Sequence, residues 1–224
     1  MTQHGSEHAK PSGSAAISRS ARAVQSEHRR SDILKASRDV LAQGHADFSL
    51  RKVAAAAGVR LNTVQHHFSD LESLIHATIE SLVGGFMQRS RQLAEGQYDS
   101  PTDDLMVFLD DAWVWIRDVN VRNLYFEVWA MARHHPSVVA MIRRIYSDYL
   151  GALALILRRI NPRLTEADAY VKATLISCWT EGAIVMVHWG SAETPSLGLL
   201  AIRMKSACLA LAETADAPAF RRGK

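Results

Sequence analysis

The sequence predicts an all-α protein of about nine to ten helices, in which a three-helix N-terminal domain precedes a bundle of longer helices. Gly and Pro are few among the 224 residues, at 12 and 6. Apolar residues make up 48% of the chain. They recur at steps of three and four, and no segment alternates as a strand would.

The first predicted helix covers residues 27–43, and two short helices follow at residues 50–57 and 61–67. Its apolar stripe is Ile33, Leu34, Ser37, Val40 and Leu41. Gly44 is a suitable residue just after a helix, and Ser49 is a suitable N-cap for the next one. A fourth helix is expected to open with a capping box at Ser69–Glu72 and to end near Glu95.

Two short helices joined by a glycine-centred turn, after a longer helix, form the helix-turn-helix pattern. The short helices must cross steeply, so their turn needs a residue that tolerates a positive φ, which Gly58 supplies. Small side chains from Ala54 to Ala57 allow close packing. Val59, Val64 and Phe68 are spaced to face the core.

The rest of the chain predicts longer helices, separated by Pro and Gly signals. They are expected at residues 100–118, 123–134, 137–160, 165–190 and 194–212. The predicted domains are residues 27–75 and 76–214. Disordered tails are expected at residues 1–26 and 215–224.

Composition excludes several classes of protein. The chain lacks an apolar segment long enough to span a membrane, and it lacks a signal peptide and the common catalytic and cofactor motifs. Cys178 and Cys208 sit in apolar helical patterns and are expected to be buried free thiols. The ten histidines are scattered. We therefore expect a cytoplasmic protein that is not an enzyme and that has no metal site or cofactor.

The formal net charge of +3 lies wholly in residues 1–76. These residues hold ten basic and seven acidic side chains, whereas residues 77–224 hold sixteen of each. A local basic excess is a mild indication of a polyanionic partner.

The side chains expected to face outward from the third helix suit the reading of bases in a major groove. They are Arg60, Leu61, Asn62, Gln65 and His66. Arg pairs with guanine, and Asn or Gln pairs with adenine. Ser49 and Thr63 are expected to contact phosphates, and Arg51 adds positive charge. The alternative is a small bundle whose polar surface binds nothing. Lys10, Arg19 and Arg22 raise a second alternative for the tail, a basic arm that touches DNA.

The stretch from Phe48 to Leu74 resembles the N-terminal domain of the TetR family of bacterial repressors. The matching residues are Ser49, Val53, Ala54, Ala57, Gly58, Val59, Thr63, His67, Phe68, Glu72 and Leu74. His67 completes the predicted DNA-binding set. The segment Trp129–Pro136 resembles the choline–betaine repressor branch. The resemblance implies a homodimer, a small-molecule effector and a near-palindromic double-stranded DNA operator.

Two positions depart from the family. Gln65 stands where the family usually has Tyr, and Leu71 stands where it usually has Lys. In the family both commonly contact phosphates, the sequence-independent part of DNA affinity. The departures predict weaker and less salt-sensitive DNA binding than is usual, unless arginines of the N-terminal tail compensate.

In the C-terminal half, the resemblance implies an effector pocket and a dimer interface. The predicted ligand-binding residues are Trp113, Tyr125, Trp129, Met131, Trp179 and Glu181. Aromatic residues at helical spacing are also typical of plain core. Trp113 and Trp115 lie about 200° apart on a helix, so both are not expected in one small site, and Trp113 is preferred.

Glu181 is the only acid between Ala173 and Gly190. It is interpreted as a hydrogen-bonded or partly exposed residue, as a partner for Arg or His across a dimer, or as the counter-charge to a cationic ligand.

The last two predicted helices carry apolar residues on more than one face, which predicts a four-helix dimer contact. The function predicted is a sequence-specific transcriptional regulator, a repressor released by a ligand. The alternative is a helical protein that binds DNA without sequence preference, or an adaptor. Sequence does not separate a repressor from an activator.

Overall fold

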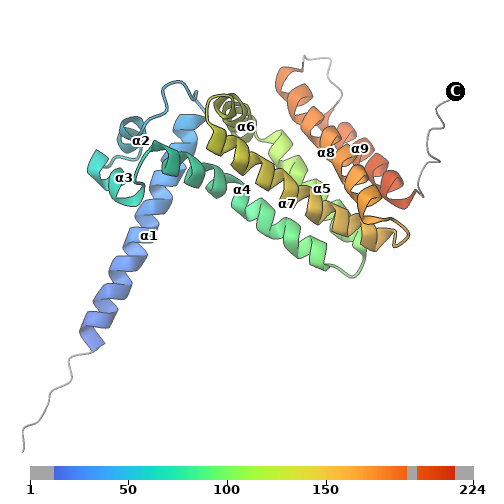
Figure 1. Ribbon diagram of the computed structural model, residues 1–224, viewed down its shortest axis with the longest axis horizontal. Helices are drawn as coiled ribbons and strands as arrows, with labels where there is room; N and C mark the ends of the chain where they lie inside the picture. The colour runs from blue at the N-terminus through green and yellow to red at the C-terminus, as the bar shows by residue number, and fades with distance from the viewer. Residues whose placement is uncertain (1–12, 191–195, 215–224) are drawn as a thin grey trace, which may run out of the picture.

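The structure, a computed structural model, describes residues 13–190 and 196–214. Over these residues the chain forms nine helices and no strand, which confirms the predicted all-α class (Figure 1). The helices are α1 (Gly13–Leu41), α2 (Leu50–Ala56), α3 (Leu61–His67), α4 (Leu71–Glu95), α5 (Pro101–Arg117), α6 (Val119–Ala132), α7 (Pro136–Ile160), α8 (Glu166–Trp189) and α9 (Leu197–Glu213).

Helix α1 begins 14 residues earlier than the sequence predicts, at Gly13 instead of residue 27. The expected tail is therefore wrong for residues 13–26, and the tail at residues 1–12 lies outside the described residues. The early half of α1 has no apolar stripe, which is why periodicity missed it. Ala and Arg still favour a helix, because they lose little conformational freedom there. Val24 in this half is 68% exposed, so the early half of α1 projects from the fold (Figure 1).

Side-chain caps fix where several helices begin. Ser49 accepts a hydrogen bond from the backbone N–H of Lys52, as predicted for the start of α2. Helix α4 begins one residue later than expected, since Asp70 and Ser73 form its capping box in place of Ser69 and Glu72. Asp118 ends α5 and also caps α6, so α6 starts at Val119 instead of residue 123.

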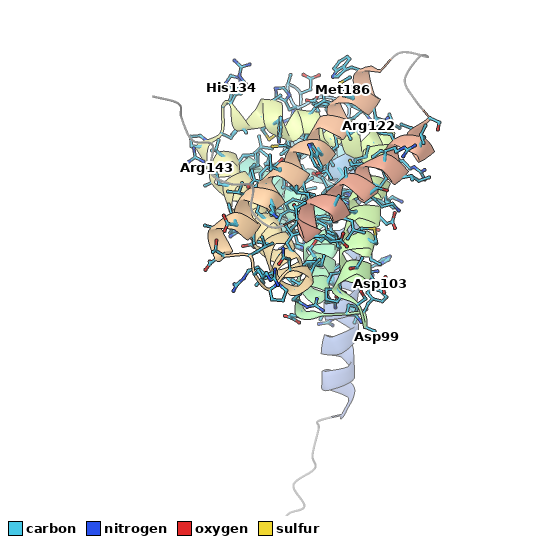
Figure 2. All side chains as sticks on the ribbon, turned by 90° about the vertical axis from the view of Figure 1, so that its right-hand side faces the viewer. Asp99, Asp103, Arg122, His134, Arg143 and Met186 are labelled. Atoms are coloured by element: carbon cyan, nitrogen blue, oxygen red, sulfur yellow. The ribbon has the colours of Figure 1, made fainter. Side chains whose placement is uncertain are left out.

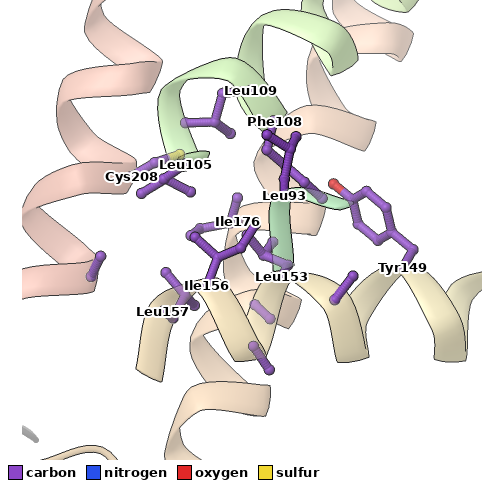
Figure 3. Packing of buried hydrophobic residues seen from close by; sticks show 14 of the residues in the cluster. Leu93, Leu105, Phe108, Leu109, Tyr149, Leu153, Ile156, Leu157, Ile176 and Cys208 are labelled. Atoms are coloured by element: carbon purple, nitrogen blue, oxygen red, sulfur yellow. The ribbon is translucent and has the colours of Figure 1, made fainter. Parts of the chain in front are cut away.

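Two hydrophobic clusters form the core, and α4 contributes to both. The N-terminal cluster joins α1–α4 to α6 and to the start of α7, through residues such as Ile33, Val64 and Leu124. The C-terminal cluster packs α5, α7, α8 and α9 around Phe108 and Leu153 (Figure 3). The predicted boundary at residues 75 and 76 falls inside α4, so one continuous helix connects the two predicted domains.

A buried ion pair fixes the turn between α4 and α5. The carboxylate of Asp104 is fully buried and accepts hydrogen bonds from the backbone N–H groups of Gln97 and Tyr98, at 3.0 and 3.1 Å. Arg159 Nη1 on α7 donates to Asp104 Oδ2 at 2.7 Å and to the backbone oxygen of Leu93 at 3.1 Å. A buried carboxylate needs such partners, and here they tie three helices together.

None of the described helices is both long and apolar enough to cross a membrane.

Candidate nucleic-acid interface and internal cavity

The turn between α2 and α3 has the geometry that its sequence predicts. Gly58 has φ +65°, a left-handed conformation that side chains of L residues disfavour. The N–H of Val59 donates to the carbonyl of Ala54 at 3.0 Å, which closes the turn. Helix α3 is thereby held at a fixed crossing over α2.

Helix α3 buries one side and exposes the other. Val64 is 0% and Phe68 is 3% exposed, as predicted for the core-facing positions. Asn62, Gln65 and His66 are exposed on the opposite side, and Arg60 lies exposed just before the helix. Leu61 and Thr63 are half-buried. The polar set therefore lies on the outer surface, where a partner can reach it.

An open groove of about 520 Å³ separates α1 from α3. We call it the α1–α3 groove. It is lined by Arg22, Gln25, Ser26, Arg29, Arg60, Asn62, Thr63, His66 and His67. Five of the nine predicted DNA-binding residues thus meet here: Arg60, Asn62, Thr63, His66 and His67. The four residues from α1 are outside the predicted set. Arg29 lies within the predicted first helix, and Arg22 was named only for the alternative of a basic arm in the tail.

Positive charge and burial act together on His67. Partial burial, the neighbouring His66, and Arg30 and Arg29 all lower the pKa of His67 below its ordinary value. The guanidinium of Arg30 lies 5.3 Å from the centre of the Phe68 ring, so it packs on the end of α3.

The other predicted DNA-binding residues lie outside the α1–α3 groove. Ser49 is occupied as the cap of α2, and Arg51 is exposed on the first turn of that helix. The neighbouring Lys52 pairs with Asp47 at 3.2 Å, which reduces its free charge. Gln65 and Leu61 are not among the residues that line the groove.

A cavity of about 130 Å³ lies inside the C-terminal domain, between α4, α5, α6, α7 and α8. Its lining is mostly aliphatic and aromatic. The aromatic residues are Phe86, Trp115, Tyr125, Trp129, Tyr146 and Tyr149. The hydroxyls of Tyr125 and Tyr146 hydrogen-bond to each other at 3.0 Å. Burial raises the pKa of Tyr146 and of Tyr149 to about 12, so both stay neutral.

Glu181 on α8 is the one acidic residue that lines this cavity. Its Oε2 atom is buried and has no hydrogen-bond partner among the described residues. Burial raises its pKa from 4.5 to about 7, because the charged form loses its hydration there. A carboxyl left without a partner in an apolar cavity is available to a ligand that donates a hydrogen bond.

The structure brings three of the six predicted ligand-binding residues to the cavity: Tyr125, Trp129 and Glu181. Trp113 and Met131 are buried in the two core clusters, and Trp179 is 40% exposed on the outside of α8. The preference for Trp113 is wrong for this cavity, since Trp115 lines it instead. Periodicity correctly separated the two indoles. It did not indicate which flank of α5 would meet the cavity.

One contact joins the loop between α1 and α2 to the cavity wall. Glu127 Oε2 on α6 accepts the backbone N–H of His45 at 2.8 Å and lies 2.6 Å from His45 Nδ1. Glu127 sits between Tyr125 and Trp129, which both line the cavity. The N-terminal domain is therefore tied directly to a helix that lines the cavity.

An apolar surface covers the outer sides of α8 and α9, which face the viewer in Figure 2. We call it the α8–α9 surface. Along α8 its stripe repeats at steps of four and three: Val171, Leu175, Cys178, Gly182, Val185 and Trp189. On α9, Leu199 and Ile202 are exposed. Cys178 is therefore exposed, and the expectation that both cysteines are buried holds for Cys208 alone.

Among the described residues, no group of three or more His, Cys, Asp and Glu side chains is placed to hold a metal ion.

A helix-turn-helix joined to a larger helical domain is an architecture of DNA-binding transcriptional regulators. No protein-family model matches this chain. The chain is 29% identical over 169 residues to the HTH-type transcriptional regulator BetI of Ectopseudomonas mendocina, across 70% of this chain and 82% of that protein. BetI of Pseudomonas aeruginosa is 27% identical over 167 residues, with the same coverage.

Solved structures share the fold. A TetR-family regulator of Mesorhizobium loti superposes with a TM-score of 0.65 at 17% identity, over 83% of this chain and 96% of that one. SmeT, the repressor of a multidrug efflux pump of Stenotrophomonas maltophilia, gives a TM-score of 0.62 at 22% identity, over 81% and 88%. The chain is therefore similar in sequence to the BetI transcriptional regulators and shares its fold with TetR-family regulators.

Proposed function

We propose that this protein binds a near-palindromic operator in double-stranded DNA as a homodimer and represses transcription until a small-molecule ligand releases it. The observation that carries the proposal is the outer side of α3, where Asn62, Gln65 and His66 are exposed on a rigid helix-turn-helix. In this proposal the protein acts in the cytoplasm, where the chromosomal DNA lies.

Base reading is assigned to the exposed polar residues of α3 and its start. Arg60 suits a bidentate contact with guanine, and Asn62 or Gln65 suits adenine. Thr63 and Ser49 are assigned to the DNA backbone, with Arg51 adding charge beside them. Leu61, His66 and His67 complete the face. Such contacts are specific only when the helix is held rigidly, which supports a role for the hydrogen-bonded turn at Gly58.

The α8–α9 surface supports a homodimer. Its stripe on α8 repeats every 3.6 residues on average, so it follows one face of the helix along its whole length and can pack against a second helix. Gly182 near the middle of the stripe would let two helices approach closely. Trp189 is 74% exposed, which is costly for an indole that nothing covers. A twofold axis through this surface would repeat α3 in a second half-site, about 34–36 Å away.

The internal cavity is assigned to the effector. About 130 Å³ suits a compact ligand, since an engineered apolar cavity of about 150 Å³ holds benzene. Tyr125 and Trp129 supply aromatic walls, and Glu181 is the hydrogen-bond acceptor. A ligand shifts the equilibrium only through its preference for the released conformation. Trp113, Met131 and Trp179 are no longer assigned to the ligand.

The experiment is fluorescence anisotropy of the purified full chain on labelled DNA from upstream of its own gene, with a scrambled duplex as control. Selective binding with two subunits per site supports the proposal. Equal affinity for the scrambled duplex favours a helical protein without sequence preference. In vitro transcription from the same DNA then separates repression from activation.

A further inference from the structure

The α1–α3 groove has two walls, and only one of them belongs to the helix-turn-helix. The second wall is a stripe on the projecting half of α1, formed by Arg22, Gln25, Ser26 and Arg29. These four residues recur at positions i, i+3, i+4 and i+7, so they lie on one face of the helix. All four side chains donate hydrogen bonds, and none of them is apolar.

This stripe has no role inside the chain. Residues 22–29 are exposed, and α1 enters the core only from Ile33 onward. Among the described residues, Arg22, Arg29 and Arg60 are in no ion pair, and no carboxylate lines the groove. Glu27, on the same stretch of α1, lies 4.0 Å from Arg30 and also opposes the lowering of the pKa of His67, but it does not line the groove. Three free guanidinium groups facing one open groove call for an anionic occupant.

The groove also opens beside the residues that the proposed function assigns to DNA. Asn62, Thr63 and His66 line it from α3. A duplex that meets the outer side of α3 must therefore pass along the stripe on α1. Arg22 and Arg29 are seven residues apart, or about 10 Å along the helix axis, a separation suited to two different phosphates of one strand.

We propose that the projecting half of α1 is a second DNA-binding element, which grips the phosphate backbone in the α1–α3 groove through Arg22 and Arg29. The inference rests on the proposed function, because the occupant is the same duplex that α3 reads. It also supplies phosphate contacts in a chain where Gln65 and Leu71 replace two expected ones. The contacts are to phosphate, so they add affinity without adding sequence preference.

The test is the salt dependence of DNA affinity. Anisotropy titrations of the full chain on the upstream duplex and on its scrambled counterpart are repeated over a range of salt concentrations. The variants are Arg22→Ala, Arg29→Ala and the double variant. Lys35→Ala is the matched control, because Lys35 is an exposed basic residue of the same helix that does not line the groove. Alanine preserves the helix, and far-UV circular dichroism checks that it does.

Each lost phosphate contact should lower the slope of log K against log salt by about 0.9, so the double variant should lose about 2 units. The ratio of affinities for upstream and scrambled DNA should stay constant, Lys35→Ala should match wild type, and Arg22→Lys with Arg29→Lys should restore most of the slope. A wild-type slope in the double variant overturns the inference.

The two proposals fail differently. If wild type binds both duplexes equally and the double variant still loses slope, the sequence-specific function is wrong and the grip by α1 stands. If wild type prefers the upstream duplex and the double variant keeps the wild-type slope, the sequence-specific function is supported and the role of α1 in phosphate binding is wrong. No binding of wild type to either duplex overturns both.

Discussion

Gly58 has a backbone conformation that few other residues accept. Because there is open space around it, a substitution there tests the backbone strain without a steric clash. A Cβ added at Gly58 would meet nothing within 4 Å, while its φ of +65° is strained for an L residue. Gly58→Ala should therefore lower the free energy of unfolding by about 1 kcal/mol through the backbone alone. Urea unfolding at fixed protein concentration measures it.

Gly85→Ala is the matched control for that substitution. Gly85 lies in the middle of α4, is exposed, and also has nothing within 4 Å of an added Cβ. Because its conformation is helical, alanine there should stabilise the protein by up to about 1 kcal/mol. Effects of the same sign at both positions would contradict the assignment of a turn-specific strain to Gly58.

Glu181 makes the stability of the protein depend on pH. Its pKa is 4.5 when solvated and about 7 in the fold, so the folded state retains a proton that the unfolded state releases between these values. Stability should therefore fall as the pH rises through that window and level off above about pH 7. The shift corresponds to about 3 kcal/mol.

Glu181→Gln removes this titration while it preserves shape. The variant should gain about 2.5 kcal/mol of stability relative to wild type between about pH 5 and about pH 8, measured by urea unfolding at both values. A difference between the two proteins that stays constant with pH would mean that Glu181 is solvated in the folded protein.

At single residues, the sequence predicts those roles that depend on neighbours along the chain. Ser49 as a cap and Gly58 in the turn are local requirements, and the structure has both. The choice between Trp113 and Trp115 could not be predicted in this way. Periodicity places them on opposite flanks of α5, but the positions of α4 and α7 decide which flank meets the cavity. That information lies in tertiary packing.

Helix α6 connects the cavity to the N-terminal domain, and the pair of His45 and Glu127 is the contact to test. A double-mutant cycle of His45→Ala and Glu127→Ala should give a coupling energy of about 1 kcal/mol, since both side chains are partly exposed. Strictly additive effects would show that the pair transmits nothing between the domains.

Among whole elements, α1 departs most from its prediction. Its apolar stripe from Ile33 to Leu41 was identified correctly, because burial leaves a period in the sequence. Residues 13–26 have no such period in the sequence, and the described side chains from Arg22 to Ser26 are exposed. A helix stabilised by backbone propensity alone gives no amphipathic signal, so its N-terminal end was placed too late.

At the scale of the whole molecule, the turn at Gly58, the cavity beside Glu181 and the α8–α9 surface lie on different helices of a continuous bundle. Helix α4 runs from the N-terminal cluster into the C-terminal one, and α6 packs against both. A change in cavity volume should therefore shift the helices that support α3, because packed cores deform little.

Dimerisation through the α8–α9 surface is the prediction that belongs to the whole molecule. Ile202 is 60% exposed on this surface, and Ile202→Glu would place one charge from each chain in the proposed interface. Light scattering should give a wild-type mass of twice 24.8 kDa and a single-chain mass for the variant. Val114→Glu is the control, since Val114 is 64% exposed on α5, outside this surface.

The loss of the dimer should appear in DNA binding as well. A single chain engages one half-site, so the affinity of Ile202→Glu for the upstream duplex should fall by about 100-fold or more, because the second contact is no longer intramolecular. Its fold should remain intact by circular dichroism, and Val114→Glu should bind as wild type does. A dimeric Ile202→Glu with unchanged affinity would move the interface to another face and remove the predicted twofold arrangement of the α3 helices.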